Sequence, residues 1–313
     1  MSKRIVTSVA LVCALATVSL GADVKTTERT QIKFEGMLGR MIGLFGGKDP
    51  RTATVAVRGD RKSQLSEGSG RIIDLSEEKI YDIDAKKKTY KVTTFDDLRR
   101  QMKEAQEQAE KEAEKAGEKP AEQTGPEYEI DFEVKETGQT KSMAGYDTRQ
   151  VLAIVSMRQK GRTLEEGGGL VLTSDMWLAP RIAALDEISK YDQKFAQQVY
   201  GEMAAMSADQ LAALLAMHPG FKKAQERMAK EGGKLAGTPL MTTLTLESVK
   251  DPAAAQQSGG GQGGGLAGRL LRRKQEAPGT RNRVFASTHE ILTVATSAAD
   301  ADVAVPADFK ERR

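Results

Sequence analysis

The sequence predicts a mainly antiparallel α+β protein, and three observations carry this prediction. Short segments of alternating apolar and polar residues follow one another between residues 24 and 93, with hairpin-sized polar breaks between them. Two later segments, starting near residues 95 and 182, repeat apolar residues at helical spacing. Strand-like segments resume after each of these helices, so sheet dominates the chain from end to end.

The first half of the chain is predicted to form a meander of strands. Its candidates for the buried face are Ile73, Leu75, Ile80, Ile83, Tyr90 and Val92. The predicted strands are Val24–Phe34, Thr52–Arg58, Gly70–Leu75, Lys79–Asp84 and Thr89–Thr93. A helix opened by Thr94 or Asp96 follows, with an apolar stripe that thins from Phe95 and Leu98 to alanines.

The second half repeats the pattern. A helix after Pro180 carries Ile182, Leu185, Ile188, Phe195 and Val199 on one stripe. A capping-box pattern at Ser207 predicts a second helix, and a third is expected over residues 221–230. The expected strands are Glu127–Val134, Lys141–Met143, Thr148–Met157, Leu170–Leu178, Leu240–Val249 and Thr288–Thr296, with a turn near Gly138.

The first 22 residues read as a signal peptide. Lys3 and Arg4 precede an apolar run from Ile5 to Val18, which ends in small residues. We expect export to the periplasm, with cleavage near Ala22. Loss of Lys3 and Arg4 lowers the basic count from 47 to 45 against 44 acidic residues, a net charge of +1. This balance gives no argument for nucleic acid as a partner, and no later segment reads as a transmembrane helix.

The domain organisation follows from composition. We expect residues 23–250 to form the sheet and helices, residues 251–282 a flexible Gly-rich linker or insertion, and residues 283–313 a final strand and tail that complete the sheet. The string Gly263–Gly268 matches a dinucleotide-binding pattern, but no strand precedes it, so linker is the favoured interpretation.

No cluster of residues in the sequence indicates a particular chemical reaction. The one cysteine, Cys13, lies in the signal peptide, and the two histidines, His218 and His289, lack a metal-binding spacing. Asp82 and Asp84 fail the EF-hand pattern, and a serine-nucleophile elbow is missing from the sequence. We therefore expect a non-catalytic protein without a metal or other cofactor.

The segment Gly36–Gly47 is unusually rich in large apolar residues between glycines. Such a surface can repack around acyl chains, although an ordinary core-capping loop explains it as well. The expected ligand contacts are Met37, Leu38, Met41, Ile42, Leu44, Phe45 and, on a later strand, Trp177.

Several short segments, scattered over most of the mature chain, together resemble a group of secreted bacterial proteins of unknown function. Their sheet is similar to that of the outer-membrane lipoprotein carrier (LolA-like) superfamily. The matching segments are Gly70–Leu75, Tyr81–Asp84, Lys88–Tyr90, Thr137–Gly138, Gly145–Tyr146, Ser174–Pro180, Gly237–Leu240 and Val305–Phe309.

The resemblance implies a curved antiparallel sheet, a half-barrel, with helices covering its concave face. It also implies a periplasmic protein that binds a hydrophobic ligand, lipid or lipoprotein acyl chain. The alternative is an interaction or sensor module that binds an envelope protein through its sheet edge or helices. A large apolar cavity favours the first function, and a filled core with an exposed apolar patch favours the second.

Overall fold

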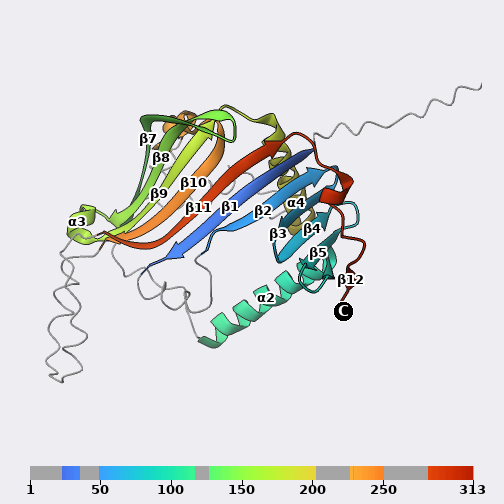
Figure 1. Ribbon diagram of the computed structural model, residues 1–313. Helices are drawn as coiled ribbons and strands as arrows, with labels where there is room; N and C mark the ends of the chain where they lie inside the picture. Colours follow the sequence, from blue (N-terminus) through green and yellow to red (C-terminus); the bar gives the residue numbers. More distant parts are fainter. Residues whose placement is uncertain are drawn as a thin grey trace, which may run out of the picture.

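The computed structural model describes residues 23–35, 49–116, 127–201, 226–227, 229–249 and 281–312. One twelve-stranded sheet, in the order β12-β6-β5-β4-β3-β2-β1-β11-β10-β9-β8-β7, organises them (Figure 1). The strands are β1 (Val24–Phe34), β2 (Arg51–Arg58), β3 (Arg61–Ser66), β4 (Ser69–Asp74), β5 (Lys79–Asp84), β6 (Thr89–Thr94), β7 (Tyr128–Met143), β8 (Tyr146–Gln159), β9 (Gly169–Ala179), β10 (Thr238–Val249), β11 (Arg281–Ala295) and β12 (Lys310–Glu311).

The sheet is almost wholly antiparallel and does not close on itself. Among the strands that the structure describes, only β12 pairs in parallel, with β6, and β7 forms the opposite edge. β11 comes late in the chain but inserts between β1 and β10, so it joins the N-terminal meander to the strands of the second half. The predicted mainly antiparallel, curved sheet is therefore confirmed.

Four strands differ clearly from the sequence-based prediction, and one of them, β12, was not predicted at all. β3 was also missed, because its sequence, Arg61–Ser66, is polar and carries only one large apolar residue. β7 runs through the expected turn at Gly138 as one strand, with a register shift between Glu136 and Thr140. β11 begins at Arg281, seven residues before the predicted start, and so takes Arg281 and Asn282 from the predicted linker.

The two long helices start where the sequence predicts. α2 (Phe95–Ala116) begins after Thr94, whose hydroxyl accepts from Asp97 N while donating to the Asp97 carboxylate. α4 (Ala183–Tyr200) buries Leu185, Tyr191 and Val199. The short elements are α3 (Leu164–Gly167), η2 (Gly232–Leu235) and η3 (Asp300–Asp302).

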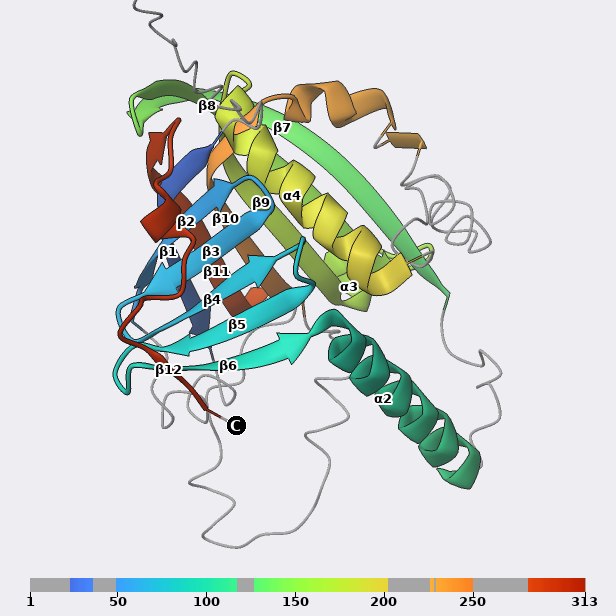
Figure 2. The ribbon, with the colours of Figure 1, turned by 90° about the vertical axis from the view of Figure 1, so that its right-hand side faces the viewer.

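α4 lies on the inner side of the curved sheet (Figure 2). We call the sheet face that carries α4 the inner face. Val24 of β1 and Val57 of β2 are paired neighbours on it and pack in one cluster with Leu185 and Tyr191 of α4. Phe95, the first residue of α2, is fully buried in the same cluster and stacks edge-on against Phe195, with ring centroids 5.4 Å apart. The broader helical cover expected for this face stays a prediction.

The predicted buried residues of the meander divide between the two faces. Ile73 and Ile80 are paired on the inner face, whereas Ile83 pairs with Tyr90 on the outer face. Part of the outer face is also covered, because Ala298 and Val303 of the C-terminal segment pack on Ala56. The sequence predicted that one face of the sheet is buried. The outer face is partly buried as well, because the C-terminal segment packs against it.

Four predictions concern residues outside the described ranges: the signal peptide (1–22), the apolar segment 36–47, the helix expected to open at Ser207, and nearly all of the linker. Of the helix predicted over residues 221–230, the structure describes Glu226, Arg227, Ala229 and Lys230, and these four residues are helical. Within the described residues, no helix combines the length and the apolar character needed to cross a membrane.

Candidate functional site

The inner face carries a row of apolar side chains that crosses six neighbouring strands. Directly paired residues of an antiparallel sheet point to the same side, and successive residues alternate. Because β1 pairs with β2 without a shift, alternate residues from Val24 onward stay on the inner face up to Phe34. Successive pairings from there define the apolar row: Phe34, Phe285, Leu246, Leu172, Val155 and Phe132.

Most of this row is only half-buried. Phe132 is 5% exposed and packs with Val134, Val151 and Leu178, but the other five side chains of the row keep part of their surface accessible. The row next to it on the α4 side, two residues along each strand, is mixed: Ile32, which is 43% exposed, and Leu244 alternate with Ser287 and Ser174. A contiguous, partly exposed apolar row such as the first one marks a contact site for a ligand or partner.

An aromatic pair forms the end of the apolar row at β11 and β1. Phe34 and Phe285 are directly opposed, with ring centroids 6.1 Å apart and planes inclined at 40°. The backbone of Glu35 continues the pairing by donating to the carbonyl of Val284. The predicted contact residues Met37, Leu38, Met41, Ile42, Leu44 and Phe45 lie outside the described residues, in the segment that follows Glu35.

Between the apolar row and the apolar core under α4, the inner face carries a polar band with an acid–base pair. His289 of β11 lies directly opposite Thr30 of β1 and Thr242 of β10. Its Nε2 is 3.0 Å from Oε2 of Glu28, and the hydroxyl of Thr26 donates to Oε1 of Glu28 at 2.7 Å. The Glu28 side chain is 16% exposed and that of His289 is 44% exposed.

The contact between Glu28 and His289 shifts the pKa of both side chains. Burial tends to raise the pKa of Glu28, but hydrogen bonds from His289 and Thr26 outweigh it and hold the pKa below its ordinary value. The hydrogen bond to Glu28 raises the pKa of His289 against the opposing effect of burial. The sequence could not reveal this pair, because its members are 261 residues apart.

Trp177 lies on the other side of the sheet. It follows Met176, which is an inner-face residue paired with Val151, and it pairs instead with Gln150 and Met241. The indole is 9% exposed, and Lys141 Nζ lies 3.8 Å from the ring centroid. Trp177 is therefore buried, as expected, but on the outer face. A ligand that contacts Trp177 would therefore lie on the opposite side of the sheet from the apolar row.

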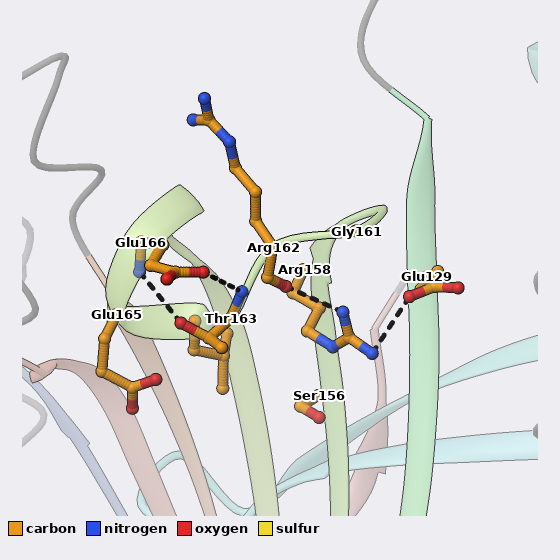
Figure 3. A pocket seen from close by; sticks show the side chains of 9 residues that line it. Glu129, Ser156, Arg158, Gly161, Arg162, Thr163, Glu165 and Glu166 are labelled. Atoms are coloured by element: carbon orange, nitrogen blue, oxygen red, sulfur yellow. Dashed lines mark hydrogen bonds and ion pairs between the residues drawn. The ribbon is translucent and has the colours of Figure 1, made fainter.

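A separate pocket of about 580 Å³ lies on the outer face beside α3. Figure 3 shows the side chains that line it. Arg158 reaches Glu129 at 3.0 Å and donates to the carbonyl of Arg162 at 2.8 Å. Thr163 and Glu166 form a reciprocal capping box at the start of α3. These contacts are internal to the protein and join the pocket lining to α3 and β7. Within the described residues, no group of three or more His, Cys, Asp or Glu side chains could hold a metal ion.

No protein-family model and no curated protein matches the chain. The LolA-like resemblance therefore stays a prediction, and the arguments below rest on the residues themselves.

Proposed function

We propose that the protein is a non-catalytic binding protein of the bacterial periplasm that takes a hydrophobic ligand, a lipid or lipoprotein acyl chain, on the inner face of its sheet. The observation that supports this most directly is the apolar row, which runs without a polar interruption across β7, β8, β9, β10, β11 and β1. A partly exposed apolar row is also the feature expected of the alternative, a module that binds an envelope protein, and the test below separates the two.

The driving force would be removal of this surface from water. Burial of apolar area contributes about 25 cal/mol per Å² before the costs of ordering the ligand. Side chains that are already held in a paired sheet lose little further freedom on binding, so much of that gain is retained. The apolar residues of segment 36–47 are proposed contacts of the same ligand, since the segment leaves the sheet next to Phe34.

Leu172 and Leu246 offer a sharp test because the adjacent pair is a matched control. Leu172 and Leu246 are paired on the inner face, and Thr173 and Thr245 are paired one residue away on the outer face. All four side chains are partly exposed. Glutamate at both leucines should weaken binding of a fluorescent fatty acid by about tenfold or more, because the acyl chain would then desolvate carboxylates.

The Thr173→Glu plus Thr245→Glu variant should bind as the wild type does. Fluorescence titration gives the affinities, and thermal unfolding shows whether both variants remain folded. Equal losses in the two variants, or no loss in either, would count against a lipid site on the inner face. In the second case, the alternative of an envelope-protein interaction module would take its place.

A further inference from the structure

The inner face grades from apolar to polar along its strands, which has a consequence for the kind of ligand it fits. From Phe285 to His289 is four residues along β11, about 13 Å at the usual strand rise. Over that distance the inner-face residues of β11 change from Phe285 to Ser287 to His289. A ligand lying along β11 would meet apolar surface at one end and hydrogen-bonding groups at the other.

The polar end presents donors. Both Glu28 oxygens are engaged, one by Thr26 and one by His289, so that carboxylate is already satisfied. His289 uses Nε2 for Glu28, and within the described residues no hydrogen bond reaches its Nδ1. A carboxylate accepts only, so Nε2 carries the proton in this pair, and protonation of the ring adds a second donor at Nδ1. Thr30 and Thr242 are the residues paired with His289 on the two neighbouring strands.

The charged groups around this position are few. Among the described residues, Glu28 on β1 contacts the ring and Lys62 on β3 acts on Glu28 through space. Lys62 is itself paired with Asp192 of α4 at 2.6 Å. Glu290 and Arg29, the neighbours of His289 and Glu28 along their strands, pair with each other on the outer face. Of the described residues around this position, a protonated His289 is therefore the cation that remains available to a ligand on the inner face.

We propose that the ligand is an amphiphile with an anionic head, and that His289 binds this head while the apolar chain extends over Leu244, Ile32 and the Phe34–Phe285 pair. The inference rests on the proposed function and deepens it by naming the chemistry of the head. Glu28 acts as a positioning residue, because it fixes the ring and leaves Nδ1 directed to the ligand.

The test compares two ten-carbon probes that differ only in the head: decyl sulfonate, which stays anionic, and decanol, which is neutral. Calorimetric titration of the purified full chain would be done at about pH 5.5 and about pH 8.5, on either side of the ordinary histidine pKa. The wild type should bind the sulfonate about tenfold more tightly at the lower pH, since the charge-assisted bond to Nδ1 exists only there. Decanol should bind equally at both.

Three variants show whether the pH dependence of sulfonate binding comes from His289. His289→Gln should remove the pH dependence and weaken sulfonate binding at the lower pH about tenfold while sparing decanol. Glu290→Gln, one residue away on the outer face, should leave both probes unaffected. Glu28→Gln should move the pH transition of sulfonate binding downward, because the charge that favours the protonated ring is gone.

The outcomes separate the two proposals. Decanol binding with no preference for the sulfonate at low pH overturns the anionic-head inference alone, and this comparison needs no variant. Equal losses for both probes in His289→Gln would reduce His289 to a structural residue, which also overturns it. Failure of the wild type to bind either probe overturns the proposed function and this inference together.

Discussion

Phe34 and Phe285 face each other across β1 and β11, with their ring centroids 6.1 Å apart, and so join the first described strand of the chain to the last long one. Both rings are half-buried. Their contact ends the apolar row at the strand from which segment 36–47 departs.

Because the rings touch but remain partly exposed, they should matter more for binding than for folding. Phe34→Ala and Phe285→Ala should each lower the free energy of unfolding by about 1 kcal/mol, less than a fully buried ring would cost. A double-mutant cycle should give a coupling of about 0.5–1 kcal/mol. Denaturant unfolding checks both values, and losses of about 4 kcal/mol for each variant would mean that the rings are core.

Asp74 should be a critical polar residue for stability. Its side chain is 1% exposed and accepts bonds from Ser76 N at 2.9 Å, Glu77 N at 2.9 Å and Arg61 Nε at 2.6 Å. Asp74→Ala should lower the free energy of unfolding by about 2 kcal/mol, because the two turn amides lose their acceptor. A substitution that is neutral in denaturant unfolding would contradict this role.

Asp74 should also make stability depend on pH. Burial tends to raise the pKa of Asp74, but the bonds from Ser76, Glu77 and Arg61 outweigh it and lower the pKa. A carboxyl group with a lowered native pKa stabilises the fold above its unfolded pKa, about 3.9, and loses that contribution as the pH falls through the native value. Asp74→Asn should therefore flatten the acid limb of the stability curve measured by urea unfolding between about pH 2 and 5.

Gly169 should tolerate no side chain. Its φ is +150°, and an added Cβ would lie 2.1 Å from the carbonyl oxygen of Met157 on the paired strand. Gly161 is the natural control, since its φ is +77° but the space around it is open. Gly161→Ala should cost about 1 kcal/mol from the backbone alone, and Gly169→Ala clearly more. Equal melting temperatures for the two variants would show that β8 and β9 can separate locally at no cost.

Trp177 provides a reporter for the outer face. Its burial beneath Lys141 predicts blue-shifted fluorescence emission and a loss of about 3–5 kcal/mol for Trp177→Ala. Since the indole faces away from the apolar row, a fatty acid bound on the inner face should leave its emission almost unchanged. A large ligand-induced shift would place the ligand on the outer face instead.

The sequence by itself determined the local elements. Period-two alternation located most of the strands, the Thr94 cap and the helical stripes located α2 and α4, and the missed β3 shows the limit of that signal where a strand carries few apolar residues. Local patterns work because propensity, capping and alternation act over a few neighbouring residues.

The tertiary structure alone decided which side of the sheet each residue occupies. The apolar row needs five strand pairings in correct register, and a shift of one residue would turn any strand's side chains to the other face. The same register separates Trp177 from the inner face and brings Glu28 to His289 across 261 residues. Such long-range pairings depend on the whole sheet assembling around α4, and no local stretch of sequence records them.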